Sequence, residues 1–281
     1  MSGLTQTIFE SPSNLASFAT KLLSSGRIVF SRDEAARELG ISTGALLDAA
    51  ERLQRRRSLV RLRQGFYVVV PPQYHAWGAP PPSWYIDDLM RHEGRPYYVG
   101  LLKAAELHGA SHQAVMEFQV VTDKRLPGIL AGRSRLTFHF RKDMSPIAAG
   151  IDSHKTETGT MQVSGAELTA LDLLRYPEAA GGIDAIATVL TDLASKINAG
   201  RLATLSRACE RSVVQRLGYL LDRLGHRESA EHMHGGLHMS PTALPWIELE
   251  GKSSADRDAT PALERNERWH VVVKRYPEVD E

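Results

Sequence analysis

Residues 31–70 read SRDEAARELGISTGALLDAAERLQRRRSLVRLRQGFYVVV, and this stretch decides the fold of the N-terminal part of the chain. Ser31 followed three residues later by Glu34 forms a capping box, which predicts a helix that ends at Gly40. A tight break follows, because Gly40 tolerates a left-handed backbone and Ser42 is a good helix cap. We therefore expect a further helix over residues 43–57, with one apolar face.

A basic β-hairpin is expected directly after that helix. Residues 59–63 and 66–70 are rich in apolar residues and flank Gln64-Gly65, a spacing typical of two strands joined by a turn. Upstream, we expect a helix over residues 12–23 and a short strand over residues 27–30. Helix, break, helix and basic hairpin is the element order of a winged helix-turn-helix, whose second helix enters the major groove of DNA. The sequence predicts such a DNA-binding domain over residues 1–72.

The positive charge of the chain is concentrated in this region. The whole chain carries 34 Lys and Arg against 33 Asp and Glu, a net charge of +1. Residues 51–63, however, contain six arginines and one glutamate. Such a stripe is typical of a surface that binds phosphate. A solvated charge run on an exposed helix and hairpin is the alternative interpretation.

Helix phase selects the residues that we expect to contact duplex DNA. Residues near the start of the recognition helix, residues 42–57, are expected beside base edges. The arginines at its far end and in the hairpin are expected on phosphate, on guanine or in the minor groove. The predicted DNA-contacting residues are Ser42, Thr43, Gly44, Asp48, Arg52, Arg55, Arg56, Arg61, Arg63 and Gln64. Binding through these arginines should depend strongly on salt.

Length and composition bound the class of protein. Of the 281 residues, 42% are hydrophobic and 24% charged, which indicates a folded chain of about two domains. Cys209 is the one cysteine, so no intramolecular disulfide forms and a reducing compartment is expected. Residues 1–13 lack the basic and apolar regions of a secretion signal, and no run of about 18 apolar residues occurs. We expect a cytoplasmic protein that is neither exported nor membrane-spanning.

Proline marks the expected domain boundary. Five of the 14 prolines fall between residues 71 and 82, where neither a helix nor a central strand can continue. Helical and strand patterns mix in the remainder of the chain. The expected fold is therefore an α/β-containing two-domain protein, with the winged helix-turn-helix over residues 1–72, a proline-rich linker over residues 73–82 and a larger α+β domain over residues 83–281.

Within the larger domain, local patterns predict several elements. We expect helices over residues 84–92, 101–108, 164–176, 184–196, 202–209 and 212–224, and strands over residues 97–99, 118–122, 135–140 and 269–273. The helix at residue 164 is expected to open with a second capping box, formed by Ser164 and Glu167. The segment 226–266 is polar and is predicted to form a loop.

Four blocks of the sequence resemble the AbiEi family of antitoxins. Residues 27–67, and above all RLRQGFY at residues 61–67, are similar to the winged-helix domain of that family. YYVGLLKAAELHG at residues 97–109, VTDKR at residues 121–125 and LDLLRYP at residues 171–177 resemble successive later blocks, in the same order. The likeness spans about residues 15 to 225.

The resemblance implies an antitoxin of an abortive-infection, type IV toxin–antitoxin pair. In such a protein the winged helix binds inverted repeats in its own promoter and represses it, and the C-terminal domain counteracts a nucleotidyltransferase toxin. The implied partners are double-stranded DNA and, functionally, that toxin. The resemblance assigns no antitoxic residues in this chain.

Enzyme signatures are absent from the sequence. It contains no GxxxxGK[ST] loop, no GxGxxG at a strand-to-helix junction and no GxSxG elbow, so we expect no catalytic residue, no cofactor and no enzymatic activity. Glu117, Asp123 and Lys124 are the one suggestive nuclease set. Adjacent residues of a strand point to opposite faces, however, which separates Asp123 from Lys124. Cys209 lies in a helical pattern and is interpreted as a small buried hydrophobe.

A histidine-rich segment invites a metal hypothesis. The possible ligands are His226, His232, His234 and His238, with Glu228 and Glu231. Two glycines follow at residues 235 and 236, so a solvated loop is the simpler interpretation and no metal is expected. A DNA-targeted nuclease or a ligand-sensing transcription factor remains the alternative to the antitoxin.

Overall fold

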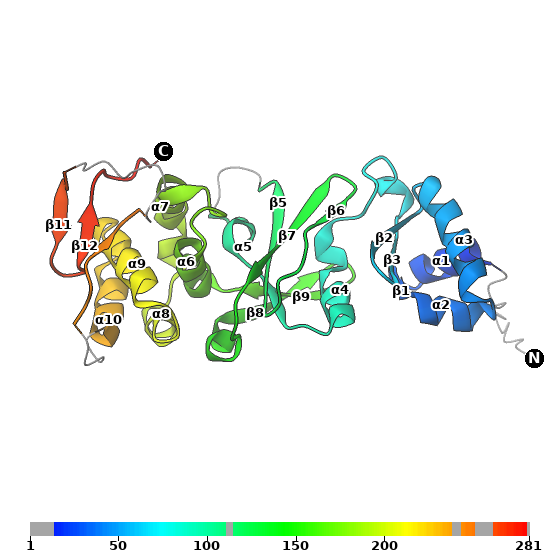
Figure 1. The fold of residues 1–281 in the computed structure, drawn as a ribbon, viewed down its shortest axis with the longest axis horizontal. Helices are drawn as coiled ribbons and strands as arrows, with labels where there is room; N and C mark the ends of the chain where they lie inside the picture. The colour runs from blue at the N-terminus through cyan, green and yellow to red at the C-terminus, as the bar shows by residue number, and fades with distance from the viewer. Residues whose placement is uncertain (1–13, 111–114, 238–242, 251–260, 280–281) are drawn as a thin grey trace, which may run out of the picture. The chain divides into compact units, whose positions relative to one another are not determined.

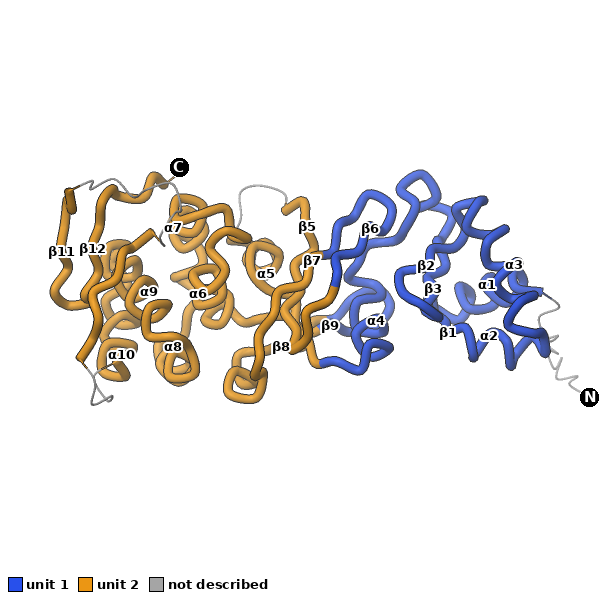
Figure 2. Tube along the Cα trace, in the orientation of Figure 1, with its two compact units in different colours: residues 1–95, 127–136, 155–161 blue, residues 96–126, 137–154, 162–281 orange. Residues whose placement is uncertain are grey.

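The protein is a mixed α/β chain, and its computed structural model describes residues 14–110, 115–237, 243–250 and 261–279. Contacts between residues divide it into two compact units (Figure 2). Unit 1 comprises Met1–Arg95, Pro127–Leu136 and Lys155–Met161. Unit 2 comprises Pro96–Leu126, Thr137–His154 and Gln162–Glu281. The chain thus returns to unit 1 twice after leaving it.

The N-terminal part of unit 1 contains three helices and a three-stranded sheet (Figure 1). Its elements are α1 (Leu15–Ser24), β1 (Val29–Ser31), α2 (Arg32–Leu39), α3 (Thr43–Arg55), β2 (Leu59–Arg63) and β3 (Phe66–Val69). The sheet has the order β1-β3-β2, with both pairs antiparallel. The helices, the short strand and the hairpin predicted from the sequence in this region are confirmed.

Local hydrogen bonds explain where α2 and α3 begin and end. The Glu34 amide donates to Ser31 Oγ over 3.1 Å and the Ser31 amide donates to Glu34 Oε2 over 3.4 Å, which confirms the predicted capping box. Gly40 ends α2 with a φ of 62°, a left-handed conformation that favours glycine. Ser42 Oγ then accepts a hydrogen bond from the Ala45 amide over 3.3 Å and caps α3.

A small hydrophobic core holds these elements together. Apolar residues spaced by three or four positions along each helix are buried against the sheet. The buried members are Leu15, Phe18, Ala19, Leu22, Phe30, Ala35, Leu46, Ala50, Leu59, Tyr67 and Val69. Leu46 and Ala50 bury one face of α3 against this core, and the opposite face of that helix is exposed.

The proline-rich stretch and the helix after it also belong to unit 1. Residues 71–95 form two short 3-10 helices, η1 (Pro72–Tyr74) and η2 (Pro82–Trp84), and then α4 (Ile86–Glu93). The ends of two later hairpins, residues 127–136 and 155–161, complete the unit. Residues 73–82 lie within unit 1, and the two units alternate along the chain. The expected division into two domains joined by a linker at residues 73–82 therefore stays a prediction.

Two sheets are built from the rest of the chain. The larger has six strands in the order β6-β7-β5-β4-β9-β8, and β4 is antiparallel to β5 and parallel to β9. Its strands are β4 (Tyr97–Val99), β5 (Glu117–Thr122), β6 (Ile129–Ala131), β7 (Ser134–Phe140), β8 (Ile151–Thr156) and β9 (Gly159–Ser164). The smaller sheet has the order β10-β12-β11, with β10 (Ile247–Glu248), β11 (Glu264–Asn266) and β12 (Val271–Val273). The sequence patterns missed β6, β8 and β9.

The helices of unit 2 surround α6, whose residues are buried from Ala166 to Leu174. The helices are α5 (Leu101–Leu107), α6 (Ala166–Arg175), α7 (Gly182–Leu193), α8 (Ala199–Ser206), α9 (Arg211–Arg223) and α10 (Arg227–Leu237). A short 3-10 helix, η3 (Ser145–Gly150), contacts α6 and α8, and another, η4 (Ala194–Lys196), follows α7.

The predicted capping box at Ser164 and Glu167 is wrong. The α6 helix begins at Ala166, after Gly165, and no side chain caps it. Ser164 Oγ lies 2.7 Å from Thr169 Oγ1, and Glu167 Oε1 instead accepts a hydrogen bond from the Asn198 amide over 2.7 Å. Both side chains are buried, and tertiary partners replace the local ones that the pattern assumed.

The predicted polar loop over residues 226–266 is also wrong in part. Residues 227–237 form α10, which packs against α8 and α9. Ala230, Met233 and Leu237 supply its buried face at helical spacing, and this pattern outweighs the two glycines near its end. Two further segments of the predicted loop are the strands β10 and β11. Residues 238–242 and 251–260 lie outside the described residues.

Candidate nucleic-acid interface

The outer face of α3 carries the residues that the sequence predicts beside DNA. Helical spacing places them away from the buried side chains of the same helix. Exposed residues of this set are Ser42, Thr43, Gly44, Asp48, Arg52, Arg55 and Arg56. On the adjoining strand and turn, Arg61 and Gln64 are exposed as well.

The arginines of this face differ in how they are paired. Arg55 Nη2 lies 2.6 Å from Glu51 Oε1, one turn away on the same helix, with both side chains more than half exposed. An exposed pair of this kind contributes little to stability and exchanges readily. Among the described residues, the guanidinium groups of Arg52, Arg56 and Arg61 have no ion-pair or hydrogen-bond partner. These three cations are therefore available to an external anion.

Arg63 is held inside unit 1 rather than directed to solvent. Its Nε lies 2.9 Å from Glu93 Oε1, and the two side chains are 18% and 17% exposed. Its Nη2 donates to the Pro127 carbonyl oxygen over 2.6 Å. Arg63 thus joins β2 to the end of α4 and to the segment that enters β6. Arg63 was predicted to contact DNA from its charge and its place in the expected hairpin, and no local pattern reveals partners that lie 30 and 64 residues further along the chain.

The turn between β2 and β3 is fixed by both of its neighbours. The Gly65 carbonyl accepts a hydrogen bond from the Arg32 amide over 2.8 Å, which joins the turn to the start of α2. His92 of α4 lies with Nε2 3.1 Å from the Gln64 carbonyl oxygen, and its ring is 5.2 Å from that of Phe66. The position of this turn is therefore set by α2 on one side and by α4 on the other.

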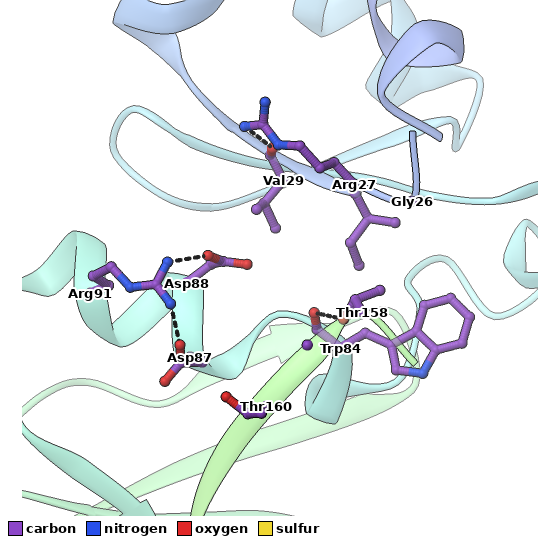
Figure 3. A pocket seen from close by; sticks show the side chains of 11 residues that line it. Gly26, Arg27, Val29, Trp84, Asp87, Asp88, Arg91, Thr158 and Thr160 are labelled. Atoms are coloured by element: carbon purple, nitrogen blue, oxygen red, sulfur yellow. Dashed lines mark hydrogen bonds and ion pairs between the residues drawn. The ribbon is translucent and has the colours of Figure 1, made fainter. Parts of the chain in front are cut away.

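A cavity of about 400 Å³ lies elsewhere in unit 1, between the segment before β1, the α4 helix and the β8–β9 turn (Figure 3). Its charged α4 side chains pair with each other. Arg91 contacts Asp87 and lies 2.7 Å from Asp88, and the charge of Asp87 is the main cause that raises the pKa of Arg91. The Thr158 hydroxyl donates to the Trp84 carbonyl oxygen over 2.5 Å.

Among the residues that the structure describes, no group of three His, Cys, Asp or Glu side chains could hold a metal ion. Glu117 begins β5, whereas Asp123 and the exposed Lys124 follow its last residue. None of the helices among these residues is both long and apolar enough to span a membrane.

Two histidines of the possible metal set, His232 and His234, lie on the α10 helix instead of in a loop. His232 Nδ1 lies 2.9 Å from the Glu228 carbonyl oxygen, and His234 Nε2 lies 3.1 Å from the carbonyl oxygen of Arg268. Residues two apart on a helix point to different sides, so these two histidines do not share a face. His238 lies outside the described residues.

A buried polar cluster lies at the centre of unit 2, and the sequence patterns did not reveal it. The Tyr98 hydroxyl donates to Asp172 Oδ2 over 2.6 Å, and Arg141 forms an ion pair with Asp172 Oδ1. Tyr98 and Asp172 are fully buried and Arg141 is 3% exposed. Burial raises the pKa of Asp172, and the charge of Arg141 opposes that rise. Burial likewise raises the pKa of Cys209 to about 11, which makes its thiol a poor nucleophile.

Taken together, these features define a mixed α/β protein with an exposed cationic helix in one unit and a buried ionic cluster in the other. Residues 98–223 match the family model described as the AbiEi antitoxin C-terminal domain. This match supports the resemblance to AbiEi antitoxins that the sequence predicted, over the part of the chain that it covers. All three residues of the buried cluster, Tyr98, Arg141 and Asp172, fall within the matched range.

A solved structure resembles almost the whole chain. The crystal structure of the RV2827C protein from Mycobacterium tuberculosis aligns with a TM-score of 0.66 over 94% of this chain and 94% of that chain, at 17% sequence identity. At that identity the likeness shows a shared fold. No curated protein matches the chain.

Proposed function

We propose that the protein is a DNA-binding antitoxin that represses its own toxin–antitoxin promoter through an N-terminal winged helix and counteracts a nucleotidyltransferase toxin through its C-terminal domain. The antitoxin role follows from the family match over residues 98–223. DNA binding and action against a nucleotidyltransferase toxin go beyond that match.

The order and packing of elements in unit 1 support a winged helix. Helices α1, α2 and α3 contact one another, and the β2–β3 hairpin follows α3 directly and pairs with β1 in one sheet. In such a domain the helix before the hairpin lies in the major groove and the hairpin is the wing. The proposal accordingly makes α3 the recognition helix and the β2–β3 turn the tip of the wing.

The observation that carries the DNA-binding proposal is the exposed cationic face of α3. Thr43, Gly44 and Asp48 lie at its N-terminal end, where side chains of a recognition helix reach base edges. Arg52 and Arg56 lie at its far end, where guanidinium groups reach backbone phosphates. Arg61 on β2 and the Arg55 side chain, once it leaves its exposed pair with Glu51, extend this phosphate-binding face.

Arg63 has a different task in this proposal. Its ion pair with Glu93 and its hydrogen bond to Pro127 hold the wing in place, so Arg63 positions the neighbouring Arg61 and Gln64 without reaching phosphate itself. The sequence had placed all three residues in one DNA-contacting set from the charge of the two arginines and from their common position in the expected hairpin.

A gel-shift experiment tests the DNA-binding half. The probe is the double-stranded DNA upstream of the protein's own coding sequence, and the variant is R52A/R55A/R56A. The matched control, R207A/R223A/R227A, removes three exposed arginines of unit 2 and changes the net charge equally. The proposal predicts a large loss of affinity for the first variant and little change for the second. Equal affinities for both variants would contradict it.

The toxin-directed half rests on the family match alone, and no contacting residues are assigned. Co-expression with a nucleotidyltransferase encoded by an adjacent reading frame tests it. We expect the full chain to relieve growth inhibition, and we expect R52A/R55A/R56A to relieve it as well while failing to repress the promoter. A full chain that leaves growth inhibition unchanged would contradict this half.

A ligand-sensing regulator is the second candidate, and the cavity of about 400 Å³ in unit 1 favours it. Cavities of this size accommodate small molecules. Its charged side chains on α4 are already paired, since Arg91 binds both Asp87 and Asp88. The antitoxin proposal is preferred because Arg52 and Arg56 of the α3 face lack such partners among the residues that the structure describes.

A further inference from the structure

A second cationic segment lies outside the predicted DNA-binding residues. Residues 124–142 contain six Lys and Arg and no Asp or Glu, and all of these cations except the buried Arg141 lie outside the cluster of unit 2. The middle of this segment is the β6–β7 hairpin, and its turn region, Pro127–Leu136, belongs to unit 1 together with α3 and β2 (Figure 2). Arg133 and Arg135, the two cations of that region, are exposed.

The pairing of β6 with β7 gives the hairpin one buried and one exposed side. Ile129 pairs with Leu136, and both are buried. The next pair, Leu130 with Arg135, points to the opposite side because side chains alternate along a strand. Leu130 is 69% exposed, so an apolar side chain and a guanidinium lie opposite each other on the outer face.

The tip of the hairpin is anchored to the segment before α4. Gly132 has a φ of 58°, and a Cβ at this position would lie 2.1 Å from the Trp77 carbonyl oxygen, which only glycine avoids. The Arg133 amide donates to the same carbonyl over 3.1 Å. The Arg133 guanidinium lies 6.0 Å from the centre of the Trp77 ring, which is itself 54% exposed. These contacts with Trp77 fix the position of the Arg133 backbone and hold its side chain beside the indole ring.

The hairpin adjoins the cationic face already described. Strand β2 contacts both α3 and β6, and Arg63 hydrogen-bonds to Pro127 at the start of the hairpin. Arg61 is exposed on the same strand β2. Within unit 1, the exposed arginines of α3, β2 and the β6–β7 hairpin therefore lie on elements that contact one another in that order.

We propose that the β6–β7 hairpin is a second DNA-contacting element, which binds the duplex beside the site contacted by α3. Arg133 and Arg135 neutralise phosphates, and the exposed Leu130 faces the minor groove, where minor-groove binders insert apolar side chains between base steps. Positive charge and continuity with the proposed DNA-binding face favour DNA as the occupant, because strand β2 contacts both α3 and β6 and the hairpin carries exposed arginines and no acidic side chain. This inference rests on the proposed DNA-binding function and extends its footprint.

Footprinting and salt-dependent binding test the proposal on the full chain with the upstream DNA as probe. In R133A/R135A we expect protection to disappear on one flank while the segment protected through α3 stays protected. The slope of log K against log salt should become shallower by about 0.9 for each phosphate that is no longer neutralised, or by about 2 in total. R133K/R135K keeps the charges and should restore most of that slope. R207A/R227A is the matched control, with the same change in net charge.

The outcomes separate this inference from the proposed function. Loss of flank protection in R133A/R135A, with retained protection through α3, supports the hairpin proposal. An unchanged footprint and slope in R133A/R135A, beside a weakened R52A/R55A/R56A, overturns the hairpin proposal and leaves the proposed function standing. Absence of sequence-selective binding by the wild-type chain overturns both. Loss of toxin neutralisation in R133A/R135A with unchanged DNA binding shows that the hairpin contacts protein, and it overturns the DNA assignment.

Discussion

The arginines of α3 and the arginine at the centre of unit 2 show one side chain in two settings. Arg52 and Arg56 are exposed and have no ion-pair partner among the described residues, whereas Arg141 is 3% exposed and paired with the fully buried Asp172. A guanidinium in the first setting is available to an external anion, and in the second it satisfies an internal one. The sequence thus shows where the arginines are, but it does not show which of them are free to bind DNA.

Breaking the buried pair should have the largest effect on stability. Asp172→Ala leaves Arg141 charged and buried without its carboxylate, and removing one partner of a buried pair lowers the free energy of unfolding by about 3–5 kcal/mol. Denaturant unfolding measures this. Glu157→Ala, at an exposed position, is the control and should change stability by less than about 0.5 kcal/mol. A loss below about 1 kcal/mol in Asp172→Ala would show that the cluster is not the centre of the core.

Cys209 tests burial near the ionic cluster, because burial is the main cause of the shift in the pKa of its thiol. Burial raises the pKa of this thiol from 9.0 to about 11, so the thiolate fraction at pH 8 is about a hundredfold lower than for an ordinary cysteine. We expect alkylation of the native protein at pH 8 to be slower by that factor than alkylation of the unfolded chain, and to accelerate as the pH rises towards 11. Equal rates for the native and the unfolded chain at pH 8 would mean that the thiol is neither buried nor raised in pKa.

Arg61 and Arg63 sharpen the comparison within a single strand. Arg63→Ala removes a partly buried ion pair and a hydrogen bond, so we expect the free energy of unfolding to fall by about 1–3 kcal/mol. Arg61→Ala should leave stability unchanged and make the salt dependence of DNA binding shallower by about 0.9. Thermal unfolding and salt titrations of both variants measure these effects. A stable Arg63→Ala variant with a shallower salt slope would return Arg63 to the DNA-contacting set.

Local sequence signals predicted unit 1 better than unit 2. The Ser31 and Glu34 capping box and the left-handed Gly40 act over three or four residues, so the pattern contains all the partners involved. The same pattern at Ser164 and Glu167 failed, because Glu167 bonds to an amide 31 residues further along the chain. The local pattern held at Ser31 and Glu34, which are partly exposed, and failed at Ser164 and Glu167, which are buried among distant partners.

For the candidate site as well, local patterns predicted some features, and contacts between distant residues decided the others. Helix phase alone predicted that Arg52 and Arg56 are exposed. It could not distinguish Arg61 from Arg63, since the partner of Arg63 lies 30 residues away in α4. The hydrogen bond between Tyr98 and Asp172 joins residues 74 positions apart, and two blocks of the family resemblance meet there without any local pattern to announce it.

The most direct test of the central claim is the salt dependence of binding to the upstream DNA, measured for the wild-type chain and for R52A/R55A/R56A. If the exposed face of α3 binds phosphate, the slope of log K against log salt becomes shallower by about 0.9 for each arginine taken away from a phosphate, or by nearly 3 for the triple variant, while the unfolding curve is unchanged. Identical slopes for the two proteins would contradict the account.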